Sequence, residues 1–260
     1  MSTASNSPSA VHACLLGHKW VDRNRLVHLD ASGEQVQVAF LIWVLQYDAE
    51  VVLVDTGFSP EAAVEKHVVD YRDPCEQLAR LGLSPSDVGT VIVSHLHWDH
   101  FHTPQRFPNA RLFIQRSDIE YYLGRGQNHP LAVELGDRAS LDELRALIAA
   151  DRVTALDGDQ VIRPGLRVER IAGHSPGMQM TVLDLDSGPL VLAGDASHLF
   201  VNLQTRTPTA LLNDYDAYQR GFDRITAVSA GGRWLPGHDP LMLDELETIG
   251  GGIYRAHPRS

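Results

Sequence analysis

The sequence predicts a single α/β domain in which strand-rich segments alternate with helices. Hydrophobic residues make up 43% of the 260 residues and charged residues 21%, which is ordinary for a globular chain with a sizeable core. No linker, repeat or low-complexity stretch divides the sequence. We therefore expect residues 1–260 to form one domain, with residues 1–10 as a frayed terminus.

Apolar, β-branched runs mark the expected strands. Residues 36–45 form the first, and residues 50–54 form a second that ends in the polar turn Asp55-Thr56-Gly57. Further strands are expected at residues 91–93, 111–115, 167–172, 179–185, 190–193 and 234–235.

Capping residues mark the expected helices. Asp73 and Pro74 suit the N-cap and first helical position of a helix that runs to Leu81 and stops at Gly82. Capping-box spacing at Ser117 and at Ser140 predicts helices over residues 118–123 and 141–150. A longer helix is expected from about residue 214 to 230.

Charge, hydropathy and cysteine content limit the classes of partner and the cellular location that we expect. A net charge of −11 argues against binding to a nucleic-acid backbone, which needs clustered cations. No apolar run approaches the roughly 18 residues of a membrane-spanning helix, and the start of the chain lacks the features of a signal peptide. Cys14 and Cys75 imply no disulfide framework. We expect a cytoplasmic protein with no nucleic-acid or membrane partner; the choice between monomer and homodimer stays open.

Four potential metal ligands lie within six residues, directly after the expected strand at 91–93. They are His95, His97, Asp99 and His100. Imidazole nitrogen and carboxylate oxygen are usual ligands of a borderline divalent metal. One cation cannot easily use all four if more ligands arrive from elsewhere, so the motif indicates two metals and hydrolytic chemistry.

Three later apolar segments each end in a glycine followed by another metal-competent residue. Glycine lets the backbone turn sharply and approach a crowded centre closely. The three residues are His174, Asp195 and His238. A natural division gives one metal His95, His97 and His174, and the other Asp99, His100 and His238. Asp195 is then free to bridge the two, and each metal keeps an open position, as in catalytic sites.

In this order, the motifs resemble the metallo-β-lactamase superfamily. The matching residues are Asp55-Thr56-Gly57, the motif at 95–100, Gly173-His174, Gly194-Asp195 and Gly237-His238. The resemblance implies a four-layer αβ/βα sandwich with the metals at the sheet edges. It also implies that Asp55 supports the ligands from behind instead of binding a metal.

Within that superfamily, the size of the chain and its Asp195-Ala196-Ser197 segment are most similar to the N-acyl-homoserine lactonases and related small lactonases. The resemblance implies a quorum-quenching type of enzyme: a metal-dependent carboxylic ester or lactone hydrolase with two Zn²⁺ per chain, or Mn, Fe or Co in their place. Attack of a metal-bridging hydroxide would open a small lactone, with Asp99 as a proton shuttle.

Three alternatives remain open at this point. One is a thioesterase of the glyoxalase II type, although the chain ends soon after His238 and leaves little room for that enzyme's C-terminal helical region. The second is a catabolic lactonase or esterase with a substrate other than an acyl-homoserine lactone. The third is a metal- or ligand-binding module that keeps the scaffold without catalysis.

Two departures from the lactonase pattern concern the substrate. His198 stands where those enzymes typically place a tyrosine that hydrogen-bonds the substrate, and an imidazole can donate the same bond, so His198 is a second catalytic candidate. Phe101 and His102 follow the motif where small residues are usual. With Trp98 and Phe107, they are predicted to line the substrate pocket.

Overall fold

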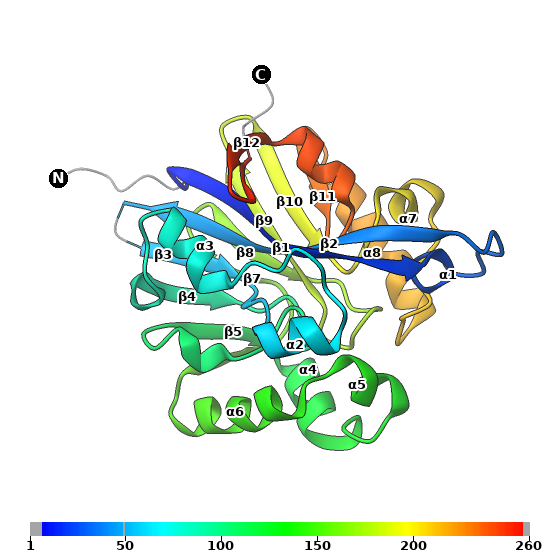
Figure 1. The fold of residues 1–260 in the computed structure, drawn as a ribbon, viewed down its shortest axis with the longest axis horizontal. Helices are drawn as coiled ribbons and strands as arrows, with labels where there is room; N and C mark the ends of the chain where they lie inside the picture. The colour runs from blue at the N-terminus through cyan, green and yellow to red at the C-terminus, as the bar shows by residue number, and fades with distance from the viewer. Residues whose placement is uncertain (1–6, 49, 257–260) are drawn as a thin grey trace.

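Two β-sheets pack against each other in the computed structural model, which describes residues 7–48 and 50–256 (Figure 1). The larger sheet has the strand order β12 (Glu247–Gly250), β13 (Ile253–Arg255), β1 (Ala10–Asp22), β2 (Gln35–Tyr47), β3 (Glu50–Val54), β4 (Val88–Ile92), β5 (Arg111–Gln115), β6 (Val153–Leu156). The smaller sheet has the order β11 (Arg233–Pro236), β10 (Gly188–Gly194), β9 (Gln179–Leu185), β8 (Leu166–Arg170), β7 (Gln160–Arg163).

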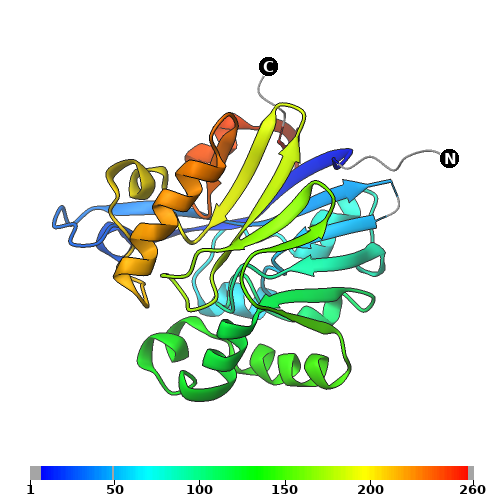
Figure 2. The same cartoon turned by 180° about the vertical axis from the view of Figure 1, so that it is seen from behind.

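Helices cover the outer faces of the two sheets, which gives the αβ/βα sandwich that the sequence predicted. Figure 2 shows the longest of them, α8 (Tyr215–Val228), lying across the smaller sheet, where it contacts β10. The other helices are α1 (Arg23–Leu26), α2 (Pro60–Glu65), α3 (Pro74–Arg80), α4 (Arg116–Glu120), α5 (Pro130–Leu135), α6 (Arg138–Ala149) and α7 (Phe200–Thr205). Short 3₁₀ turns lie at η1 (Pro85–Asp87), η2 (Pro104–Arg106) and η4 (Pro240–Glu245), and a π-helical turn at η3 (Tyr121–Arg125). No helix in the described part of the chain is both long and apolar enough to cross a membrane.

The position of β2 explains why residues 38–45 are continuously apolar. Val38, Phe40 and Ile42 belong to the core cluster under the outer helices. Leu41 and Trp43 belong to the cluster between the two sheets, together with residues of β8, β9 and β10. Successive side chains of a strand point to opposite faces, so a strand buried on both faces needs apolar residues throughout.

The direction of the strands gathers several loops at one edge of the sandwich. Strands β3 and β4 run parallel in the larger sheet, so the segments that follow them leave on the same side. In the smaller sheet, β10 is parallel to β11 and antiparallel to β9, and β9 is antiparallel to β8. The chain therefore leaves β8, β10 and β11 at one common edge.

Both helices that were expected from capping boxes begin elsewhere. Helix α6 starts at Arg138, because Asp137 is the N-cap and its carboxylate accepts from the backbone N–H of Ser140 at 2.7 Å. Helix α4 starts at Arg116 without a side-chain cap. The spacing identified the right region in each case but not the capping residue.

The sequence reading missed several strands of the larger sheet. Strand β1 pairs with both β2 and β13, and β12 and β13 follow the strand that we expected to be the last. The expectation of a frayed start is wrong at Ser9 and Ala10, because Ser9 N donates to Gln46 O at 2.8 Å and Ala10 begins β1. Residues 1–6 of that expectation lie outside the described residues.

A buried glutamine pair joins the two sheets. Gln179 on β9 donates through Nε2 to Val93 O at 2.7 Å. Gln115 on β5 donates to Gln179 Oε1 at 2.9 Å, and both side chains are buried. Because these polar groups are out of water, each hydrogen bond that is lost leaves a buried group unsatisfied.

We predict that Gln179→Ala lowers the free energy of unfolding by about 1–3 kcal/mol, because it removes these bonds from the interior. Urea denaturation measures the change. Gln160→Ala on the exposed strand β7 is the matched control and should leave the unfolding midpoint unchanged. Equal effects of the two substitutions would contradict a role of the pair in joining the sheets.

Candidate metal centre

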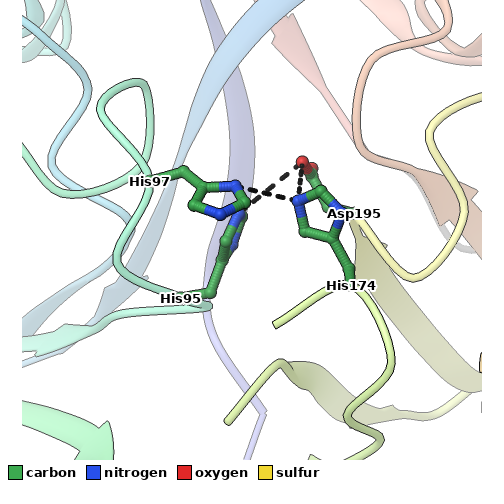
Figure 3. A group of neighbouring side chains, drawn as sticks. All are labelled: His95, His97, His174 and Asp195. Atoms are coloured by element: carbon green, nitrogen blue, oxygen red, sulfur yellow. Dashed lines mark hydrogen bonds and ion pairs between the residues drawn. The ribbon is translucent and has the colours of Figure 1, made fainter. Parts of the chain in front are cut away.

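All seven predicted metal ligands meet at the edge where the parallel strands end. His95, His97, Asp99 and His100 lie on the loop after β4, and His174 lies on the loop between β8 and β9. Asp195 directly follows β10, and His238 follows β11 with one glycine between. Figure 3 shows four of them pointing toward one another from the two sheets.

One group of ligands joins three histidines to Asp195. The candidate ligand atoms of His95, His97, His174 and Asp195 all lie within 4.8 Å of one another. His174 Nε2 is 2.9 Å from His97 Nδ1 and 3.1 Å from Asp195 Oδ2. His95 Nε2 lies 3.6 Å from the same carboxylate oxygen and has no hydrogen-bond partner among the described residues.

The second group contains Asp99, His100 and His238, whose ligand atoms also lie within 4.8 Å of one another. His100 Nε2 and His238 Nε2 are 3.3 Å apart. The other oxygen of Asp195, Oδ1, lies 3.2 Å from His100 Nε2 and 2.9 Å from His238 Nε2. Asp195 thus presents one oxygen to each group.

Hydrogen bonds on the far side of three rings determine which nitrogen faces the centre. Nδ1 of His174 donates to Leu211 O at 2.5 Å, and Nδ1 of His238 donates to Ala39 O at 2.9 Å. Nδ1 of His100 donates to Asp55 Oδ2 at 2.7 Å. These bonds leave the Nε2 atoms of the three rings facing the centre, as is usual behind metal-binding histidines.

This arrangement fits a bound cation. The Nε2 atoms of His100 and His238 lie 3.3 Å apart, and both are close to a carboxylate oxygen of Asp195. Against the effect of burial, the surrounding carboxylates raise the pKa of both rings, so the space between these nitrogens favours a positive charge. Imidazole nitrogen with carboxylate oxygen is a donor set that suits zinc and its neighbours among the divalent metals.

Asp55 lies behind His100, where the resemblance puts it. Its Oδ1 accepts from Ser94 N at 2.7 Å and its Oδ2 from Ser94 Oγ at 2.9 Å, in addition to the bond from His100. The backbone of Asp55 has φ of +67°, which is uncommon for a residue other than glycine. The hydrogen bonds to Ser94 and His100 hold this residue in its strained conformation at the end of β3.

Three of the ligands lack their titrating proton at neutral pH. Burial holds the pKa of His95 and of His97 well below the usual range, so both rings are neutral. Burial alone would raise the pKa of Asp99, but the imidazoles of His100 and His238 hold it at about 2. Asp99 is therefore ionised at neutral pH.

Glycine permits close approach at two places in the centre. A Cβ on Gly237 would lie 2.8 Å from Asp195 Oδ1 and 2.8 Å from the backbone of Gly194. Gly173 has φ of +101°, and a Cβ there would lie 2.6 Å from the backbone of Tyr218. Both glycines directly precede a ligand histidine, as the sequence pattern indicated.

Comparison with known proteins agrees with this geometry. Residues 34–244 match the description "Metallo-beta-lactamase superfamily". The chain belongs to this superfamily. The predicted family and fold are thereby confirmed.

Curated relatives with similar sequences carry the name N-acyl homoserine lactonase. One from Bacillus thuringiensis is 27% identical over 233 residues, which cover 84% of this chain and 81% of the relative. The N-acyl homoserine lactonase AiiB of Agrobacterium fabrum is 26% identical over 249 residues, with 86% and 87% covered. The predicted similarity to the lactonase branch of the superfamily is confirmed by these matches.

Solved structures of lactonases share the fold. A quorum-quenching N-acyl homoserine lactone lactonase superposes with a TM-score of 0.80 at 24% identity, covering 95% of this chain and 98% of that one. An N-acyl homoserine lactone hydrolase with the product N-hexanoyl-L-homoserine at its catalytic metal centre gives 0.80 at 22% identity, with 94% and 98% covered.

Part of the predicted substrate pocket is wrong, because some of its residues do not line the cleft over the metal centre. Trp98 lines the cleft together with Asp99 and His198. Phe101 and Phe107 do not line it, because their side chains are buried in the core under the outer helices. His102 also lies outside it, with its backbone N–H bonded to Thr56 Oγ1 at 2.9 Å. The bulk of Phe101 therefore fills the core under the outer helices and does not line the cleft.

Asp118 is a positioning residue that the sequence reading missed. Its buried carboxylate accepts from Gly177 N at 2.6 Å, from Ser175 Oγ at 3.0 Å and from Leu96 N at 3.3 Å. It thus joins the loop that carries His174 to the loop that carries the first four ligands. Burial raises its pKa to about 6. The capping-box spacing at Ser117 predicted only a helix start, and no local pattern marked Asp118 as a link between the two loops.

We predict that Asp118→Asn weakens metal binding by about tenfold or more, because an amide cannot accept all of these bonds and the two ligand loops lose their connection. Competition with a chromophoric chelator measures the affinity. Asp157→Asn, at an exposed residue paired with Arg116, is the matched control. Unchanged affinity in the Asp118 variant would refute the positioning role.

Proposed function

We propose that the chain is a dinuclear zinc-dependent hydrolase that opens an N-acyl-homoserine lactone or a related small lactone or ester. The observation that carries the proposal is the placement of Asp195, whose Oδ1 lies beside His100 and His238 and whose Oδ2 lies beside His95 and His174. A carboxylate that presents one oxygen to each of two ligand groups is suited to bridging two metals. The names of the relatives support the same substrate class.

The two groups of three ligands would each hold one metal ion, with Asp195 between them. When bound, the pair would supply hydroxide at neutral pH and polarise the lactone carbonyl. Asp99 lines the cleft and is ionised, so it is our candidate to carry the proton from the attacking water to the leaving oxygen.

His198 is our candidate for the group that hydrogen-bonds the substrate. It lines the cleft, and its ring lies 4.8 Å from the ring of His174 and 5.4 Å from that of His238, measured between centroids. Its Nε2 is 3.1 Å from Asp195 Oδ2, and its buried Nδ1 has no hydrogen-bond partner among the described residues. A proton on this ring would stabilise the oxyanion of the tetrahedral intermediate.

A metal-content assay paired with turnover tests the proposal. We expect about two zinc ions per chain by elemental analysis, and acid release from acyl-homoserine or simple lactones that chelation abolishes and zinc restores. His95→Ala should lose one metal and nearly all activity. His28→Ala, at a half-buried residue outside both ligand groups, is the control.

Two outcomes would contradict this function. Stoichiometric metal without turnover of any lactone, ester or thioester would favour the binding module. Faster acid release from S-acyl glutathione than from every lactone would favour the thioesterase. The cytoplasmic location stays a prediction beside these.

The role of His198 has its own test. His198→Phe removes the hydrogen-bond donor and should lower kcat by about 100-fold, a typical loss for one oxyanion donor. His198→Tyr restores a donor and should recover part of the rate. Steady-state kinetics at saturating metal measure both variants. Retained activity in the phenylalanine variant would eliminate the role.

A further inference from the structure

The wall of the cleft contains a lysine on an otherwise apolar strand face. Strands β1 and β2 extend beyond the rest of the larger sheet toward α1 (Figure 1). Lys19 and Val21 on β1 and Val38 and Phe40 on β2 all line the cleft. Trp20, which lies between Lys19 and Val21 on β1, points to the opposite face of the strand and is 59% exposed. The alternation of the strand therefore directs the lysine inward and the tryptophan outward.

The ammonium of Lys19 has no hydrogen bond or ion pair with the described residues, although the side chain is half-buried. Burial lowers the pKa of its ammonium, and the nearby charges of Arg25 and Lys66 lower it further. The carboxylates of Asp99 and Glu134 act in the opposite direction and raise this pKa. Partial burial of a cation without a partner is unfavourable. A negatively charged group of a ligand would relieve this cost.

Arg25 adds a second cation to the lining of the cleft. Its backbone is held in place, because its carbonyl oxygen accepts from Ala210 N at 3.0 Å and from Thr209 Oγ1 at 2.6 Å. Its guanidinium pairs with Glu134, but both side chains are largely exposed, so the pair is weak and can open.

The remaining charges of the cleft do not cancel these cations. The carboxylates in the lining belong to Asp99 and Asp195, which are committed to the two ligand groups. The protein as a whole carries a net charge of −11, whereas its cleft is lined by two cations, Lys19 and Arg25. The cleft volume is about 110 Å³. This is well below the roughly 300–1,000 Å³ of sites for drug-sized ligands.

From this lining we infer that the preferred substrate is a small lactone or ester that carries a carboxylate, which binds between Lys19 and Arg25 while the ester group lies at the metal centre. The inference rests on the proposed hydrolytic function and narrows its substrate class. A long uncharged acyl chain would lay methylene groups against the Lys19 ammonium without compensating its lost hydration. A carboxylate gains charge-assisted hydrogen bonds in the same place.

A matched pair of lactones tests this selectivity on the metal-loaded full chain. The probes are 5-oxotetrahydrofuran-2-carboxylate and its uncharged carboxamide, and acid release gives kcat/KM for each. We expect the wild type to prefer the carboxylate, and Lys19→Met to reduce that preference about tenfold to hundredfold. Lys19→Arg should retain most of it. Arg116→Gln removes an exposed cation outside the cleft and should leave the ratio unchanged.

An unchanged ratio in Lys19→Met would overturn the inference, because it would mean that the lysine only extends its head into solvent. A second readout does not need turnover: calorimetric binding of 2-hydroxyglutarate, the ring-opened product of the carboxylate probe, and of 4-hydroxybutyrate, the ring-opened product of γ-butyrolactone, which lacks the second carboxylate. The wild type should favour the dicarboxylate, and Lys19→Met should lose that advantage. If no lactone is hydrolysed but this binding difference holds, the hydrolytic function fails and the carboxylate site stands. Equal loss of affinity for both products would overturn the site.

Discussion

Much of this structure depends on placing the Asp195 carboxylate between two sets of imidazoles in the interior of the protein. A buried carboxylate is costly unless it is paired, and His174, His100 and His238 lie within 3.2 Å of its oxygens. Asp195 can occupy this position because β10 ends there, and because Gly237 on the neighbouring segment has no side chain to block the close approach. The sandwich brings the ends of β4, β8, β10 and β11 to one edge, and each supplies part of the ligand set.

Hydrogen bonds behind the ligands make the centre a preorganised one. Backbone carbonyls hold His174 and His238, and Asp55 holds His100, so the inward nitrogens need not reorganise to bind a cation. Asp118 acts one step further out, because it connects the two loops on which the ligands stand. The cost of a strained backbone at Asp55 is local, and the benefit is a fixed ligand geometry.

The ligand set could be predicted from the sequence because metal binding requires particular residue types at short spacing. Interior strands could be predicted as well, since residues 38–45 of β2 are buried on both faces of the sheet and are all apolar. The sequence did not reveal β12 and β13, which are short strands at one end of the larger sheet, where all of β12 is exposed. Phe101 looked like a pocket residue because it neighbours the ligands, yet its direction is decided by tertiary packing that no local pattern encodes. Lys19 was missed for the same reason: only the pairing of β1 with β2 shows that it points inward.

In the function that we propose, the centre and the cleft divide the chemistry between them: the metal ligands would supply hydrolysis, and the β1–β2 wall would select what is hydrolysed. The central claim is that Asp195 bridges two metals, and anomalous diffraction at the zinc edge from crystals of the zinc-loaded protein tests it most directly. We expect two peaks, one inside the group of His95, His97 and His174 and one inside the group of Asp99, His100 and His238, with an oxygen of Asp195 directed at each. A single peak, or two peaks with Asp195 contacting only one, would contradict the account.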